Sequence, residues 1–198
     1  SGSVGTVLSS PPPFPTLIIT QYETLLTSAA SASGAYNNYA LAFDGSNDWV
    51  QIGNSNDINT GSNNHTQKTI EAWFEVNNKD LTSYKQTIYE QGGTVRGLNI
   101  YIYGGSLYVG GWNEPNGESD WDPGTWLSTN GIQSNTWHHV ALTLNGGNSV
   151  TNNAFKGYLD GTQFGSGQGS KLWNHGGDVS IGRNRDTKFH SGDYNSSR

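Results

Sequence analysis

Short stretches in which apolar and polar residues alternate recur along most of this chain, between clusters of Gly, Asn, Asp and Ser. The clearest is TIEAWFEV at residues 69–76, whose four apolar side chains would share one face of a strand. Further strands are predicted at residues 39–43, 48–52, 86–90, 98–103, 106–112, 125–128, 137–144, 155–159, 162–164 and 178–181. No window shows convincing helical periodicity, so the chain is predicted to be all-β.

Two sequences predict tight hairpins. Gly104 and Gly105 separate the strands predicted at 98–103 and 106–112, and Asp160 and Gly161 follow the strand predicted at 155–159. About ten short strands joined in this way favour two packed antiparallel sheets. We therefore predict a two-sheet antiparallel jelly-roll β-sandwich with an extended N-terminal arm.

Residues 1–35 differ from the rest and are predicted to form this arm, with the jelly-roll domain over 36–198. Prolines between residues 11 and 15 favour extended backbone, residues 16–27 (TLIITQYETLLT) resemble a strand, and residues 28–34 form a linker of small residues. The arm is either a tether or a strand that docks on a sheet edge, in its own molecule or a neighbour's. The apolar residues expected to dock are Leu17, Ile18, Ile19, Tyr22, Leu25 and Leu26.

Several segments, in order, resemble the successive strands of a concanavalin A-like, laminin-G-like jelly-roll domain. They are FDGSNDWVQI (43–52), TIEAWFEV (69–76), GLNIYIYGGSLYVG (97–110), NTWHHVALTLNG (135–146), FKGYLDGTQFGSG (155–167) and VSIGRN (179–184). The resemblance covers roughly residues 36–190. It implies the fold, but the fold hosts lectins, adhesion modules, glycanases and spacers alike.

The family pattern normally closes with a further strand, of the type aromatic-Gly-x-Ile-Asp-Glu-Val, after the region that here ends at Arg198. A missing strand would leave an open sheet edge and an unfilled groove. We expect residues 16–27 to fill this gap, either within the chain or by passing into the next subunit of a polymer.

Composition narrows the class of partner. The net charge is −6, which argues against nucleic acid, and no apolar run is long enough to span a membrane. Only 13% of residues are charged, 27 are Gly, and none is Cys. This surface of neutral polar groups is typical of extracellular β-proteins, and the absence of cysteine fits a bacterial surface protein.

Catalytic patterns are absent from the sequence. Glycanases of this fold usually carry a tight Glu-x-Asp-x-(x)-Glu run on one strand, and none occurs here. His138 and His139 are adjacent on a predicted strand, so they would point to opposite faces and are interpreted as structural. We therefore predict that the chain is not an enzyme.

The loop at residues 113–124 (NEPNGESDWDPG) is the main candidate for ligand binding, because it combines carboxylates with flanking tryptophans. Exposed tryptophan faces would stack on sugar rings, and carboxylates would bind Ca²⁺. Trp112, Glu114, Asn116, Trp121 and Trp126 are the predicted ligand-binding residues, and Asp120 and Asp122 are candidate calcium ligands. The alternative is a solvated acidic loop with its tryptophans folded inward.

A second calcium site is implied by the family resemblance, near the Phe-Asp-Gly turn. Here it would use Asp44 and Asp48, although the same residues also make a good turn. Together these features predict a secreted, non-catalytic module that binds a glycan or a cell-surface ligand, with calcium as a candidate cofactor. The alternative function is a structural subunit of an extracellular filament assembled through the arm.

Overall fold

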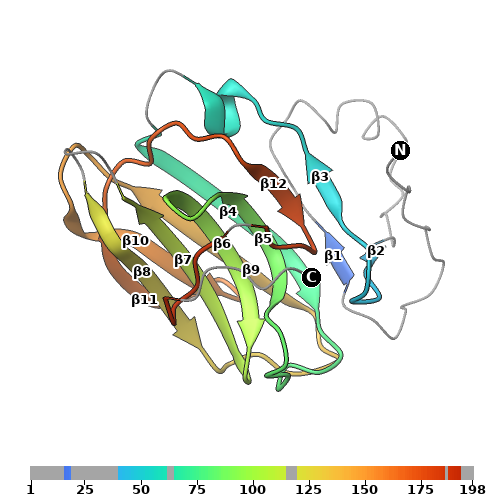
Figure 1. Cartoon of the computed structure of the whole chain (residues 1–198). Coiled ribbons are helices and arrows are strands. Elements are labelled where there is room, and N and C mark those ends of the chain that lie inside the picture. The colour runs from blue at the N-terminus through green and yellow to red at the C-terminus, as the bar shows by residue number, and fades with distance from the viewer. Residues whose placement is uncertain (1–15, 19–39, 62–64, 115–119, 186, 193–198) are drawn as a thin grey trace, which may run out of the picture.

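The computed structural model describes residues 16–18, 40–61, 65–114, 120–185 and 187–192, and places them in two packed antiparallel sheets (Figure 1). The strands of the first sheet, in spatial order, are β11 (Thr162–Gly169), β10 (Thr151–Leu159), β9 (His138–Asn145), β4 (Gln67–Glu75), β1 (Thr16–Ile18) and β2 (Leu41–Ala42). The strands of the second are β3 (Val50–Ile52), β12 (Asp178–Ile181), β5 (Gln86–Gly92), β6 (Arg96–Tyr103), β7 (Ser106–Asn113) and β8 (Trp121–Thr129). The predicted jelly-roll sandwich is confirmed.

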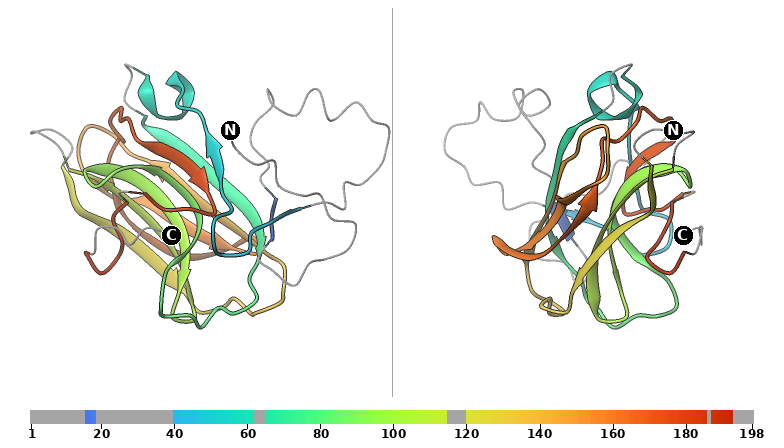
Figure 2. Two further views of the ribbon diagram at one scale, coloured as in Figure 1. Left: turned by 45° about the vertical axis from the view of Figure 1, so that its right-hand side comes forward. Right: turned by 90° about the vertical axis from the view of Figure 1, so that its left-hand side faces the viewer.

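The core lies between the two sheets and is built by the predicted alternation. On β4, Ile70, Ala72 and Phe74 are buried, as is Val76 just beyond it, and Leu98, Ile100 and Ile102 of β6 face them from the other sheet. Burying these apolar faces is the main force that holds the two layers together. The two layers are seen edge-on in the turned views of Figure 2.

Both predicted hairpins are present. Gly104 and Gly105 have φ values of 54° and 86° between β6 and β7, and Asp160 and Gly161 have φ values of 50° and 78° between β10 and β11. Left-handed backbone at both central residues matches the right-handed twist of the flanking strands. These turns fix the register of two strand pairs.

Two features differ from the predicted element map. Strand β8 begins at Trp121, inside the stretch predicted as a loop. A single π-helical turn, Asn56–Thr60, interrupts the β-structure, with the Ser55 side chain accepting a hydrogen bond from the Ile58 N–H. Sequence periodicity could not reveal a five-residue turn that depends on one capping side chain.

Part of the arm lies inside a sheet. Thr16–Ile18 forms β1, which runs antiparallel to both β4 and β2, with Thr16 opposite Glu75 and Ala42. The other predicted docking residues, Ile19, Tyr22, Leu25 and Leu26, lie outside the described residues, as does the boundary predicted at residue 36. Within the described ranges, no helix is long and apolar enough to cross a membrane.

Candidate ligand-binding cleft

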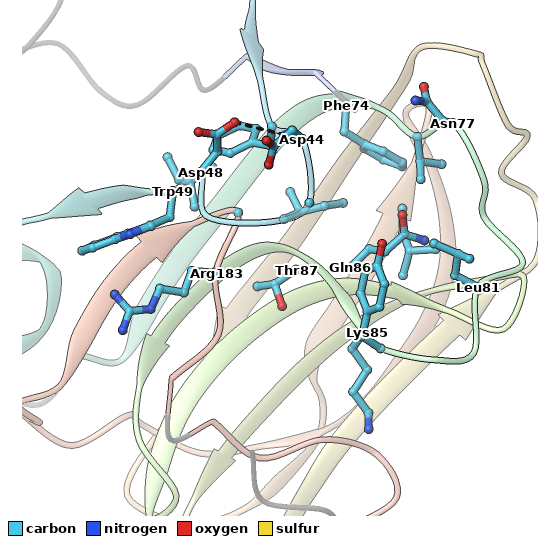
Figure 3. A pocket seen from close by; sticks show the side chains of 18 of the residues that line it. Asp44, Asp48, Trp49, Phe74, Asn77, Leu81, Lys85, Gln86, Thr87 and Arg183 are labelled. Carbon is cyan, nitrogen blue, oxygen red and sulfur yellow. Dashed lines mark hydrogen bonds between the residues drawn. The ribbon is translucent and has the colours of Figure 1, made fainter. Parts of the chain in front are cut away.

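A cleft of about 510 Å³ opens at the end of the sandwich where β2 and β4 finish (Figure 3). Its floor is the edge of the core, where Phe43, Phe74, Ile88 and Ile181 are buried. Its rim carries polar and aromatic side chains from the turn at residues 44–49, from residues 77–87 and from Arg183. An apolar floor with a few polar groups around the mouth is the usual design of a small-molecule site.

The turn at residues 44–48 is held by its own carboxylates. The Asp48 Oδ2 atom accepts a hydrogen bond from the Asp44 N–H at 3.1 Å, and the Asp44 Oδ1 atom accepts one from the Ser46 N–H at 2.7 Å. Gly45 has a φ of 78°, a left-handed conformation that glycine adopts without strain. The two aspartates therefore shape the turn and still present oxygen atoms at the rim of the cleft.

Trp49 is the aromatic surface of the cleft. Its side chain follows the turn directly and is 38% exposed, and the Arg183 guanidinium carbon lies 4.3 Å from its ring centroid. Arg183 belongs to the segment after β12, so two strands that pair in the second sheet bring these side chains together. The stacked pair offers both an apolar face and hydrogen-bond donors.

Polar side chains line the opposite wall. The Asn77 Oδ1 atom is buried and has no hydrogen-bond partner among the described residues, while Gln86 Nε2 donates to the Asn78 carbonyl at 2.8 Å. Lys85 also lines the cleft, but its ammonium lies 4.7 Å from the Phe189 ring centroid and 5.1 Å from that of Tyr103. The Asn77 Oδ1 atom is thus a buried acceptor without a partner, on a residue that lines the cleft.

The predicted loop site is rearranged in the structure. Trp112 and Trp121 are 0% and 2% exposed, so the prediction that their faces are open to sugar rings is wrong. Trp121 packs edge-on against Phe155 in the core, and Trp112 stacks on Trp126 on the outer face of the second sheet. Burial of large aromatic faces outweighs their exposure in this loop, because the residues lie in strands rather than in a free loop.

The carboxylates of that loop meet a lysine instead of a metal-ligand set. Lys188 Nζ donates to Glu114 Oε1 and lies 3.4 Å from Asp122 Oδ1, and its side chain is buried. An ammonium between two carboxylates supplies the positive charge that calcium would bring, so Asp122 is already paired with a cation, while calcium binding by Asp120 stays a prediction. Asp120 is exposed, and Asn116 lies outside the described residues.

Asp44 and Asp48 are the other calcium candidates. Calcium takes six to eight oxygen ligands. Nowhere in the described ranges do three or more His, Cys, Asp or Glu side chains form a group that could hold a metal. These two aspartates would therefore supply only two carboxylates, with backbone, water or ligand oxygens completing the shell.

The two histidines of residues 138–139 are structural, as interpreted from their alternation. His138 is buried, its Nδ1 lies 2.8 Å from Asp160 Oδ2, and its Nε2 accepts the Gln133 N–H at 2.9 Å. His139 lies on the other face, with its ring centroid 5.1 Å from that of Trp73. Both His138 ring nitrogens contact polar groups of the protein, and the His139 ring contacts Trp73.

A family model described as Concanavalin A-like lectin/glucanases superfamily matches residues 22–196. The chain belongs to this superfamily. No curated protein matches the chain significantly. Concanavalin A-like and laminin G-like domains fit a carbohydrate- or ligand-binding module, although the superfamily also includes glycosidases.

Three residues of the cleft were missed by sequence reasoning. Trp49 was assigned only to a strand, although an aromatic residue directly after a Gly-Asp-rich turn is a usable signal. Asn77 and Arg183 lie 28 and 134 residues further along the chain than Trp49, and only the fold brings them to one cleft.

Proposed function

We propose that this concanavalin A-like domain is a non-catalytic, extracellular binding module whose ligand is a glycan held in the cleft beside Trp49. One observation carries the proposal: an exposed tryptophan face, stacked on Arg183, lies next to the carboxylates of Asp44 and Asp48. Sugar rings present an apolar C–H face and a rim of hydroxyl groups, and this site offers a partner for each.

The lining favours a neutral glycan. The Asp44 and Asp48 carboxylates are acceptors for hydroxyl hydrogens, and the Arg183 guanidinium is a donor to hydroxyl oxygens. A strongly anionic ligand would meet the two aspartates at the rim. Calcium remains part of the proposal only at this turn, where Asp44 and Asp48 would hold it.

A glycan array probed with the full chain tests this function, and Trp49→Ala is the decisive variant. We expect the wild type to retain at least one glycan and Trp49→Ala to lose at least tenfold in affinity. Trp137→Ala is the matched control, because Trp137 is 36% exposed but does not line the cleft. Equal binding by both variants would exclude the cleft, and a repeat with chelator tests calcium at the turn.

A second candidate function is favoured by β1. This strand lies between β4 and β2 and pairs with both, yet it faces only residues 73–75 of the nine-residue β4. Residues 19–39 join it to the domain, and 21 residues can span about 70 Å when extended. A chain of this length would let the strand dock in a neighbouring copy as well as in its own, which would build a filament.

Cysteine cross-linking separates the two arrangements, since the natural sequence has no cysteine. Thr16 and Glu75 are directly opposite across β1 and β4, so Thr16→Cys and Glu75→Cys would form a disulfide. If strands exchange, a concentrated mixture of the two single variants gives covalent dimers. If only the double variant cross-links, and only within one chain, the filament proposal fails. Thr162→Cys in place of Glu75→Cys is the control, because β11 is the far edge of the sheet.

A further inference from the structure

A row of polar residues, interrupted by Gly110, crosses the outer face of the second sheet. The register places Ser180 of β12 opposite Glu90 of β5, Glu90 opposite Asn99 of β6, Asn99 opposite Gly110 of β7, and Gly110 opposite Trp126 of β8. Directly opposite residues share a face, and their neighbours along the strands, such as Leu98 and Val109, fill the core. Five strands at about 4.8 Å spacing make the row about 19 Å long.

The segment after β12 contacts Glu90 and Asn99 of this row. Asn99 Nδ2 donates to the Lys188 carbonyl at 2.8 Å and to Thr187 Oγ1 at 3.2 Å, and Glu90 Oε1 accepts the Arg185 N–H at 2.8 Å. We call residues 184–185 and 187–190 the closing segment. Its backbone and hydroxyl groups thus satisfy part of the hydrogen-bonding capacity of Asn99 and Glu90.

Two polar atoms of the row are left unsatisfied. Asn99 Oδ1 and Trp126 Nε1 are buried and have no hydrogen-bond partner among the described residues. Both lie against Gly110, where a Cβ atom would collide with each of them. One is an acceptor and the other a donor, at a position without a side chain, and leaving both unpaired is costly in a folded protein.

The charges around the row select among ligands. Glu90, Glu114 and Asp122 would repel an anion, and the unpaired indole N–H, together with the Lys188 ammonium, is unsuited to a cation. A hydroxyl group both donates and accepts, so it is the group that satisfies Asn99 Oδ1 and Trp126 Nε1 together.

We propose that this row is a second binding site, for an extended neutral oligosaccharide, and that the closing segment occupies it in the free protein. The Lys188 ammonium, bound to Glu114 and Asp122, clamps the segment over the site. The ligand competes with the segment, and its hydroxyl groups pair with Asn99 and Trp126. The site uses none of the cleft residues Asp44, Asp48, Trp49 and Arg183, so binding at this site can be tested separately from binding in the cleft.

The test measures binding of cellohexaose, xylohexaose and mannohexaose to the full chain by calorimetry. Lys188→Met removes the clamp, and we expect it to bind at least one probe tenfold or more tightly than the wild type. Trp126→Phe in the Lys188→Met background removes the indole N–H and keeps the ring, and it abolishes the gain. Trp49→Ala in the same background leaves the gain intact, which separates this site from the cleft.

Two controls keep the outcome decisive. If Lys188→Met does not fold, Glu114→Gln combined with Asp122→Asn loosens the clamp with side chains of the same shape. Trp126→Phe alone is expected to change the melting temperature little, because it removes an unpaired buried donor but also shortens the ring that stacks on Trp112. The proposal is overturned if no probe binds the loosened variants more tightly. It is also overturned if Trp126→Phe lowers the melting temperature without affecting binding, since the indole then serves a buried water only.

Discussion

Arg183 lies over the ring of Trp49, with its guanidinium carbon 4.3 Å from the ring centroid. The two residues come from the segments that flank β3 and β12, which pair in register from Ile52 opposite Val179 to Val50 opposite Ile181. The strand pairing therefore sets the orientation of the tryptophan at the mouth of the cleft. Any ligand that stacks on Trp49 does so on a ring already held on one side by a cation.

Replacing Arg183 by Ala is expected to free the Trp49 ring. At a site this exposed the cation–π contact is worth about 0.5–1 kcal/mol, so the effect on global stability is small. The measurement is quenching of tryptophan fluorescence by acrylamide, which should rise in Arg183→Ala and rise less in Arg183→Lys. In a Trp49→Phe background the Arg183→Ala change should leave the remaining fluorescence unaltered; a rise there would place the effect on another tryptophan.

Replacing Lys188 by Ala should destabilise the domain far more. Removing one partner of a buried ion pair costs about 3–5 kcal/mol. Glu114 and Asp122 are 28% and 56% exposed, so water compensates part of the loss and we expect about 2 kcal/mol. Urea unfolding measures the change. Asp122→Asn, at the more exposed partner, should lower the free energy of unfolding by less than about 1 kcal/mol. Equal losses in Lys188→Ala and Asp122→Asn would contradict the burial of the Lys188 side chain.

The sequence predicts the sandwich well because its evidence is local. Alternation on β4 and the Gly104–Gly105 turn need only neighbouring residues, and both are found as predicted. The tryptophans of residues 112–126 show the limit of this reasoning. Composition locates an acidic, aromatic stretch, but the face that each side chain takes depends on where β8 begins.

The candidate sites depend on pairings that are distant in sequence. Lys188 meets Glu114 across 74 residues, and Arg183 meets Trp49 only because β12 pairs with β3. Lys188 and Arg183, in the segment after β12, carry no local signal for either contact. The carboxylates alone therefore predicted a metal in the loop, where the fold supplies an ammonium.

Acid should destabilise the fold through two histidines, His175, which is buried, and His65, which is half-buried. Burial is the largest cause that lowers the pKa of His65 to about 4, with Lys68 and His175 adding repulsion, and burial also lowers the pKa of His175. An unfolded histidine titrates near 6.5, so the unfolded state takes up protons first as the pH falls. Stability should decline from above pH 6.5 towards pH 4.

The melting temperature measured between pH 8 and pH 4 tests this expectation. His65→Gln and His175→Gln should each flatten the decline, and the double variant should flatten it further. The His175 Nδ1 atom contacts the Trp173 carbonyl at 2.7 Å and its Nε2 lies 3.1 Å from Gln91 Nε2, so both ring nitrogens are engaged. Profiles parallel to the wild type would show that other groups cause the acid sensitivity.

Asp160 stabilises the domain through two side-chain contacts as well as through the turn, and Asp160→Gly tests this. Its Oδ2 atom lies 2.8 Å from His138 Nδ1, and its Oδ1 atom accepts the His139 N–H at 2.8 Å. Because Asp160 has a φ of 50°, Asp160→Gly relieves a left-handed conformation and would be neutral or stabilising if the turn were its only role. Loss of the two hydrogen bonds should instead destabilise the domain by about 2 kcal/mol in urea unfolding. Asp160→Asn keeps one acceptor oxygen and tolerates the left-handed region, so its free energy of unfolding should lie between those of Asp160→Gly and the wild type. If Asp160→Gly is as stable as the wild type, the two hydrogen bonds contribute nothing and Asp160 serves only the turn.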